Sequence, residues 1–338
     1  EYFVLDGQVK ALEDYFSICE DYEKEAITKH LKSKRLIIGP WYVLSDEFLV
    51  SGESLIRNLE TGIKKSKEFC DYQKVGYLPD TFGHNSQMPQ ILKKFGLNSS
   101  IIWRGVEPDD TFFNWESPNG DSVFVVYLKE GYYQPIVDQE NYEVLMNTFI
   151  TKYSAFSNYS NILLTNGGDH IMPAYADIKA NIKHLEDKYK IQIESTSYSL
   201  YVDSIENKKS YQTIKGELRS NKNCYVLPNV LSTRYYIKQK NQQLEERFKM
   251  LESLIVKAHT FSQYNYQKTL DQAWETFLLN HPHDSICGCS IDDVHKEMDT
   301  RTLKINHTLD ALEKDCYQTL GAFPDIKNNV TNATKIFD

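Results

Sequence analysis

Residues 75–103, with the sequence VGYLPDTFGHNSQMPQILKKFGLNSSIIW, decide the fold class of this chain. The apolar residues 75–78 predict a short strand that runs into Pro79, and residues 99–103 predict a second strand. Between them, residues 87–95 have the pattern of a helix that starts near Pro89. A strand, a helix and a strand in this order are typical of parallel sheets covered by helices.

The same alternation extends in both directions from this unit. Further strands are predicted at residues 35–39, 122–127 and 161–165, and further helices at residues 51–68 and 175–189. After about Lys215 the strand patterns stop, and helical patterns follow at residues 232–264, 270–279 and 291–320.

These patterns predict an α/β fold class, with a mostly parallel, barrel-like sheet domain over residues 1–215 and a three-helix bundle over residues 216–325. Residues 326–338 end on Lys-Ile-Phe-Asp, as though another strand starts there. The chain begins without a Met on what reads as an apolar strand. We therefore expect the N-terminal part of the first domain to be missing.

The composition of the 338 residues excludes several classes of protein. Hydrophobic residues make up 41% and aromatic residues 13%, which excludes a disordered chain. The net charge of −9 argues against a nucleic-acid partner, because phosphates need a basic face. No apolar run reaches the roughly 18 residues of a membrane helix. Six cysteines are too few for a disulfide framework, so we expect reduced thiols in a cytoplasmic protein.

Two aspartates stand where predicted strands end. Asp80 follows residues 75–78, and Asp169 follows residues 161–165 after a pair of glycines that allow close approach of a ligand. Reactive groups gather at such strand ends in open α/β sheets, which makes both candidates for catalysis and Asp80 a candidate metal ligand. Alternatively, Asp80 caps a turn while His84 packs in the core, and Asp169 belongs to an ordinary Gly-Asp turn.

A third segment, residues 280–289, interrupts the helical half of the chain. Two histidines two residues apart, His281 and His283, adjoin Asp284, and these residue types suit metal binding. Cys287 and Cys289 follow, but no second cysteine pair completes a structural zinc site. We interpret both cysteines as small residues of a tight loop.

Paired carboxylates are the catalytic groups of glycoside hydrolysis. Retaining enzymes hold them about 5–5.5 Å apart, one as the nucleophile and the other as acid and then base. The separation of Asp80 and Asp169 in sequence does not fix their distance in space.

The three segments, in this order, resemble the α-mannosidases of glycoside hydrolase family 38. The motifs that carry the resemblance are PDTFGH at residues 79–84, GGDH at residues 167–170 and HPHDSICG at residues 281–288. Residues 41–57, together with GELR at residues 216–219 and LSTR at residues 231–234, resemble the bacterial branch, which includes mannosylglycerate hydrolases. The resemblance runs over nearly the whole chain.

The resemblance implies a role for individual residues. Asp80 matches the catalytic nucleophile, which also binds a zinc ion, and Asp169 matches the acid/base. His283 matches a second zinc ligand, with Pro282 standing where the family has another His. The residues implied to lie near or bind the sugar are Phe82, Arg104, Tyr132 (with Tyr133 as an alternative) and Asp284.

The implied chemistry is double displacement on a mannose whose vicinal hydroxyls are bound by zinc. Asp80 would attack the anomeric carbon, and Asp169 would protonate the departing oxygen and then deprotonate a water. Asp169 must therefore hold a proton near neutral pH, which burial or a neighbouring carboxylate would favour.

One feature of the family is absent. Its other two zinc ligands come from a His-X-Asp segment after the first strand, whereas the first histidine here is His30. Since the family's C-terminal β-domains are also absent, we expect a partial chain. Residues before Glu1 would supply the two further ligands, and residues 326–338 would be the start of a missing β-domain.

We therefore predict a retaining, zinc-dependent α-mannosidase of the cytoplasm that acts on α-mannosides without a nucleic-acid or membrane partner; homo-oligomerisation is left open. Three alternatives remain at this point. The first is a hydrolase of mannosylglycerate or of phosphorylated mannosides on the same scaffold. The second is a zinc-dependent deacetylase or amidohydrolase, which also uses Asp and His at strand ends. The third is a non-catalytic mannoside-binding protein.

Overall fold

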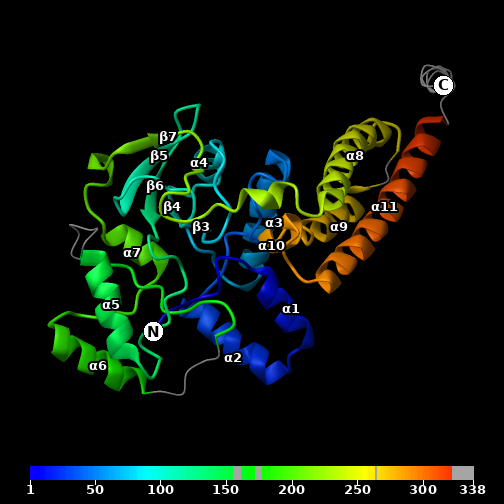
Figure 1. Ribbon diagram of the computed structural model, residues 1–338. Coiled ribbons are helices and arrows are strands. Elements are labelled where there is room, and N and C mark those ends of the chain that lie inside the picture. The colour runs from blue at the N-terminus through cyan, green and yellow to red at the C-terminus, as the bar shows by residue number, and fades with distance from the viewer. Residues whose placement is uncertain (155–160, 172–176, 263–264, 322–338) are drawn as a thin grey trace. The chain divides into compact units, whose positions relative to one another are not determined.

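The computed structural model in Figure 1 describes residues 1–154, 161–171, 177–262 and 265–321. The chain divides into two compact units. The first unit comprises residues 1–47 and 59–228, and the second comprises residues 48–58 and 229–338. The boundary near residue 48 precedes helix α3 (Gly52–Phe69), whose first turns belong to the second unit.

The first unit is built on a mixed sheet. Among the described residues this sheet has five strands in the order β3-β4-β6-β5-β7. Their bounds are β3 (Gly76–Leu78), β4 (Ser99–Ile102), β5 (Phe112–Glu116), β6 (Ser122–Tyr127) and β7 (Thr213–Lys215). All neighbouring pairs are parallel except β5 and β6, which pair antiparallel. A separate parallel pair is formed by β1 (Phe3–Val4) and β2 (Leu36–Ile37).

The first unit also contains helices. Their bounds in the first unit are α1 (Lys10–Ile18), α2 (Asp21–Lys32), α4 (Met88–Lys94), α5 (Tyr142–Ser154), α6 (Ile178–Tyr189), α7 (Tyr198–Ser204) and the short 3₁₀ turn η1 (Lys208–Ser210). Apolar side chains of the strands form one core with Tyr201 and Val202 of α7. A second core joins α5 to α6, which lie side by side in Figure 1, through Phe149 and Leu185.

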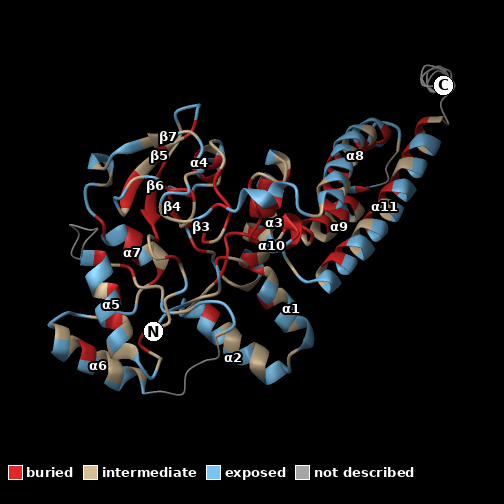
Figure 2. Cartoon of the chain, viewed as in Figure 1, coloured by how far each residue is buried: buried red, intermediate tan, exposed pale blue. Residues whose placement is uncertain are grey.

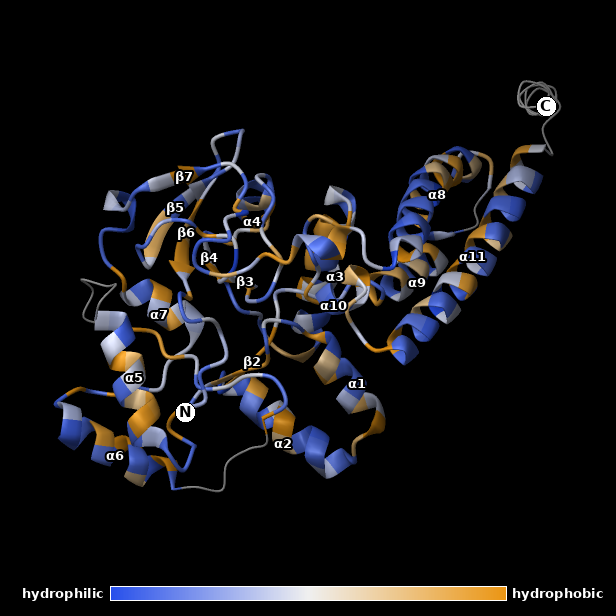
Figure 3. Cartoon of the chain, viewed as in Figure 1, coloured by the Kyte–Doolittle hydropathy of each residue, from blue (hydrophilic) through white to orange (hydrophobic). Residues whose placement is uncertain are grey.

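Strand β6 shows why the central strands form where they do. Its sequence, SVFVVY, is rich in β-branched and aromatic residues, and every residue after Ser122 is buried. Figures 2 and 3 show this strand as buried and hydrophobic, as expected for a strand covered on both faces.

Residues 161–165 do not form a strand, so this prediction is wrong. Leu163 packs in the core of the sheet, whereas Ile162 and Leu164 pack against the core between α5 and α6. In place of a ladder partner, the Asn161 carbonyl accepts a hydrogen bond from the Tyr201 hydroxyl at 2.9 Å. An apolar run of this kind indicates that its side chains are buried on two sides. A loop that lies between two cores has the same pattern, so the pattern alone does not establish a strand.

The second unit is helical. Its elements are the 3₁₀ turn η2 (Pro228–Leu231), which starts at the boundary, α8 (Tyr235–His259), α9 (Gln267–Leu278), α10 (His283–Cys287) and α11 (Asp292–Gly321). Side chains of α8, α9 and α11 share one core. At its centre the Phe248 ring stacks on Trp274, with the ring centroids 4.2 Å apart. Burial of such rings is the main stabilising contribution of a helical unit.

The α/β fold class predicted from the sequence is confirmed, with a sheet that is mixed. A barrel-like closure and a bundle of three helices remain predictions. The predicted β-domain start at residues 326–338 lies outside the described residues, as do residues 175–176 and 263–264 of two predicted helices. None of the helices in the described part of the chain has both the length and the apolar character needed to cross a membrane.

Candidate active site

The parallel register of three strands determines where the candidate residues meet. Leu78 of β3 pairs with Ile102 of β4, which pairs with Tyr127 of β6, so these strands end at the same edge of the sheet. Asp80 and Arg104 follow two residues after the ends of β3 and β4. Such an edge is where open α/β sheets gather functional groups.

Arg104 binds the Asp80 carboxylate. Its Nε and Nη2 atoms both lie 2.6 Å from Asp80 Oδ1, and its Nη1 donates to the Tyr225 carbonyl oxygen at 2.7 Å. The guanidinium lies over the Trp103 ring at 4.0 Å from its centroid and 5.2 Å from that of Phe82. Charge-assisted hydrogen bonds and ring stacking together fix the position of the carboxylate.

The Tyr132 hydroxyl lies between the two candidate catalytic carboxylates. Its oxygen is 3.2 Å from Asp80 Oδ2 and 2.6 Å from Asp169 Oδ2. Burial, followed by the hydrogen bond to Asp169, raises the pKa of Tyr132 far above its usual range. The hydroxyl therefore stays protonated, and with its single hydrogen it donates to one carboxylate at a time.

Asp169 reaches this position from a loop. The Asn166 side chain accepts hydrogen bonds from the backbone N–H groups of Ile136 and Val137 at 2.8 and 3.0 Å, which ties the loop to the chain that follows Tyr132. A Cβ on Gly168 would lie 2.2 Å from the Tyr133 ring, so only glycine fits there. Asp169 itself is exposed. The burial expected around its carboxyl group is therefore absent.

The second unit carries the other two predicted site residues, His283 and Asp284, at the start of α10. The His283 Nδ1 atom lies 3.4 Å from Asp284 Oδ1, which also accepts a hydrogen bond from the Cys289 thiol at 3.1 Å. Gly288, at φ +81°, ends the helix, and the Arg234 Nε donates to its carbonyl oxygen at 3.1 Å. The LSTR motif thus holds the segment that carries His283.

His281 is a structural residue. It is fully buried, and its Nε2 lies 2.8 Å from the Asn241 side-chain oxygen. Burial lowers the pKa of His281 to about 3, so the imidazole is neutral. The segment therefore offers His283, rather than a pair of histidines, to a ligand.

The described residues do not complete a metal site. No group of three or more His, Cys, Asp or Glu side chains that could hold a metal ion occurs among residues 1–154, 161–171, 177–262 and 265–321. Asp80 and His283 are oxygen and nitrogen donors of the kinds that zinc accepts, but they supply two ligands at most and belong to different units.

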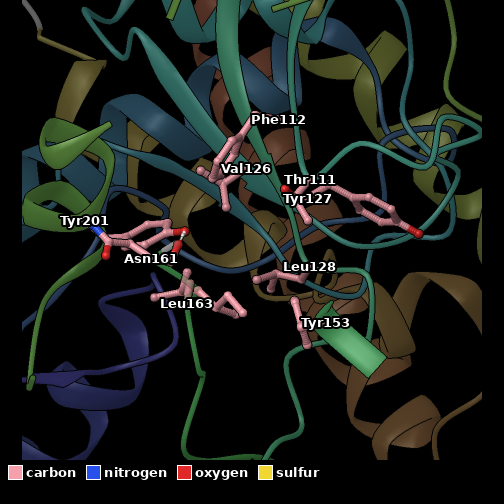
Figure 4. Close-up of a pocket in the computed structure, with 10 residues that line it drawn as sticks. Thr111, Phe112, Val126, Tyr127, Leu128, Tyr153, Asn161, Leu163 and Tyr201 are labelled. Carbon is pink, nitrogen blue, oxygen red and sulfur yellow. Dashed lines mark hydrogen bonds between the residues drawn. The ribbon is translucent and has the colours of Figure 1, made fainter. Parts of the chain in front are cut away.

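A cavity in the first unit is separate from these residues. Figure 4 shows it between the sheet and its neighbours, with Phe112, Val126 and Leu163 in its wall. The cavity has a volume of about 10 Å³, which holds at most one water molecule and is too small for a sugar ring.

Two residues that hold the site together received no role from the sequence. The buried Asp46 accepts a hydrogen bond from the Phe82 backbone N–H at 3.0 Å, and the buried Glu47 lies 2.6 Å from His84 Nδ1. The sequence feature that could have identified them is a pair of adjacent acids in an apolar stretch, residues 41–50. A carboxylate that such a stretch buries needs a hydrogen-bonding partner.

Two family models match the chain. The model described as the glycosyl hydrolases family 38 N-terminal domain matches residues 3–226. The model described as the alpha mannosidase middle domain matches residues 227–320.

Similar proteins agree with these matches. A protein of Halalkalibacterium halodurans named "Putative mannosylglycerate hydrolase" is 34% identical over 329 residues, which cover 90% of this chain and 36% of that protein. Human alpha-mannosidase 2C1 is 28% identical over 272 residues, which cover 77% of this chain and 25% of that protein. The crystal structure of an alpha-mannosidase from Enterococcus faecalis superposes with a TM-score of 0.87 at 30% identity, over 95% of this chain and 38% of that chain.

The chain therefore spans well under half of the length of each of these relatives. The resemblance drawn from the three motifs is confirmed by the match over residues 3–226, which contains both candidate aspartates. The chain belongs to glycosyl hydrolases family 38.

Proposed function

We propose that the protein is a retaining, zinc-dependent α-mannosidase. Family membership and the names of the similar proteins support hydrolysis of mannosides. The observation that carries the proposal is the Tyr132 hydroxyl, which contacts one carboxylate oxygen of Asp80 and one of Asp169. This contact supports the presence of two carboxylates at one reacting centre.

The contact also limits the separation of the carboxylates. Two oxygens at 2.6 and 3.2 Å from a third atom are at most about 6 Å apart, so the nearest oxygens of the two carboxylates are compatible with the about 5–5.5 Å of retaining glycosidases. The geometry is therefore compatible with Asp80 as a nucleophile that attacks the anomeric carbon directly.

The proposed reaction has two steps. In the first, Asp80 forms a bond to the anomeric carbon while the bond to the aglycone oxygen breaks, and the Asp169 proton passes to that oxygen. In the second, Asp169 takes a proton from water, the water oxygen bonds to the anomeric carbon, and the Asp80 ester bond breaks. Arg104 holds Asp80 in place throughout, and Tyr132 provides a hydroxyl donor to whichever carboxylate carries more charge.

Zinc belongs to the proposal as an expected cofactor. When bound, it would act as a Lewis acid towards sugar hydroxyls, with Asp80 and His283 as two of its ligands. Because the described residues do not complete that site, no step above depends on it. Asp284, Phe82 and Arg104 are the proposed neighbours of the sugar.

A second candidate is a mannosylglycerate hydrolase, which the name of the Halalkalibacterium halodurans relative favours. Both candidates use the same two carboxylates and differ in the aglycone. Relative values of kcat/KM for mannosylglycerate and for a neutral aryl α-mannoside distinguish them, because a site adapted to a carboxylate aglycone binds it with charge-assisted hydrogen bonds.

Tyr132→Phe tests the carrying observation. Loss of a hydrogen bond to a charged group at about 1.5–3 kcal/mol corresponds to a decrease in kcat of about 10- to 100-fold on an aryl α-mannoside. The ring and its contact with Trp103 remain, so the melting temperature should change little.

Tyr22→Phe is the matched control for this variant. Tyr22 is 70% exposed on α2 and received no role in the site, so the same loss of a hydroxyl should leave kcat unchanged. Equal rates for wild type and Tyr132→Phe would contradict the proposed arrangement.

A further inference from the structure

The loop that carries Asp80 is held by two buried acids from a segment more than thirty residues earlier in the chain. Glu47 is 3% exposed and Asp46 is 1% exposed. Burying a carboxylate costs several kcal/mol unless its oxygens are bonded to donors, so two such residues side by side need an explanation.

Both oxygens of Glu47 contact the loop. Oε1 lies 2.6 Å from His84 Nδ1, and Oε2 accepts hydrogen bonds from the Asn85 backbone N–H at 2.8 Å and from the Asn85 side chain at 3.2 Å. Asp46 adds a bond from the Phe82 backbone N–H at 3.0 Å. The segment therefore binds residues on both sides of Gly83, whose φ of +96° turns the loop.

Other contacts fix the same stretch from a second direction. The backbone N–H and carbonyl of His84 pair with those of Leu218, both at 2.9 Å, and the His84 ring lies edge-on to Trp115. His84 is thus enclosed by Glu47, Leu218 and Trp115. The rest of the loop has little freedom to move, whereas the Asp80 carboxylate stays 18% exposed at the edge of the sheet.

We infer that Glu47 is a positioning residue, which acts through His84 and Asn85 to hold the Asp80 carboxylate where it can attack the substrate. Stability alone does not require an ionisable group there, because apolar replacements of buried charges are often neutral or stabilising. Burial raises the pKa of Glu47, and the His84 imidazole opposes that shift. The inference rests on the proposed function, since it requires a nucleophile to position.

Glu47→Asp tests the inference in the complete protein. The variant keeps the charge but shortens the side chain by one methylene, so its carboxylate reaches His84 and Asn85 together only if the loop moves. Misplacement of a reacting group by about 1 Å costs about 100-fold, so we expect kcat on an aryl α-mannoside to fall about 10- to 100-fold. KM should change by less than about threefold, because substrate binding does not depend on this misplacement.

Glu245→Asp is the matched control. Glu245 is 8% exposed and accepts hydrogen bonds from the Ser51 backbone N–H and the Ser54 hydroxyl at 2.8 and 2.7 Å. The same shortening should lower its melting temperature without lowering kcat per folded molecule. Glu47→Gln is the second Glu47 variant, and it tests the positioning role if Glu47→Asp does not fold. Its side-chain amide has only one acceptor oxygen in place of the two of the carboxylate, so kcat should fall here as well.

The outcomes are distinct. A wild-type kcat in a folded Glu47 variant would overturn the positioning role and would not affect the proposed function. Equal decreases in kcat for Glu47→Asp and Glu245→Asp would have the same consequence. A wild-type protein that cleaves no α-mannoside would overturn the proposed function, and with it the inference.

Discussion

Asp80→Ala is expected to abolish turnover of α-mannosides, with kcat reduced by about 10⁴-fold or more, as for other enzymes that lose their nucleophile. The reason is chemical, because without the carboxylate no ester to the anomeric carbon forms and the reaction loses its first step. Steady-state kinetics on an aryl α-mannoside with a good leaving group measure the effect. Such a substrate needs little protonation, so the loss does not depend on the general acid.

Asp187→Asn is a suitable comparison for both aspartates discussed here. Asp187 is an exposed residue of α6, and its change should leave kcat unaltered. Because Asp80 pairs with Arg104, its removal also leaves a partly buried guanidinium without this partner carboxylate. Asp80→Asn keeps a hydrogen-bond acceptor for Arg104 and should be equally inactive. An Asp80→Asn variant with wild-type kcat would exclude a nucleophilic role.

Asp169→Ala is expected to lower kcat by about 10²- to 10⁴-fold on substrates with poor leaving groups, which is the usual contribution of a general acid. The loss should be much smaller for bond cleavage in a substrate with a good leaving group, because that oxygen departs without a proton. This dependence on the leaving group separates the role of Asp169 from that of Asp80.

A small anion supplies a second readout for Asp169. Azide attacks a glycosyl-enzyme without the help of a base, so it should restore turnover of the activated substrate in Asp169→Ala. The product should be the α-mannosyl azide, since two displacements retain the configuration. A loss that is the same for good and poor leaving groups, with no azide product, would assign Asp169 another role.

The sequence was sufficient where local pattern and sheet register decide the structure. The apolar runs at residues 75–78, 99–103 and 122–127 predicted three strands of a mostly parallel sheet. In the structure these strands are parallel neighbours, which brings Asp80 and Arg104 to one edge. The run at residues 161–165 shows the limit, because its side chains alternate between two cores without strand pairing. Strand β5, which pairs antiparallel with β6 across a tight turn at residues 117–121, was not predicted.

The site shows a similar division. Asp80 and Asp169 followed from their place after apolar runs, and the resemblance assigned their roles. The contact of Tyr132 with both carboxylates depends on a loop conformation, and the pairing of Glu47 with His84 joins residues distant in sequence. Such pairings are properties of the folded chain, and no local pattern encodes them.

The most direct test of the account is to identify the residue that becomes glycosylated. The complete protein would be incubated with a 5-fluorinated mannosyl fluoride, which slows the second step and keeps both vicinal hydroxyls, and its peptides analysed by mass spectrometry. We predict one fluoromannosyl adduct, on the peptide that contains Asp80 and specifically on Asp80, and none in Asp80→Ala. An adduct on Asp169 or another side chain, or an enzyme that turns over mannosides while forming no adduct, would contradict the central claim.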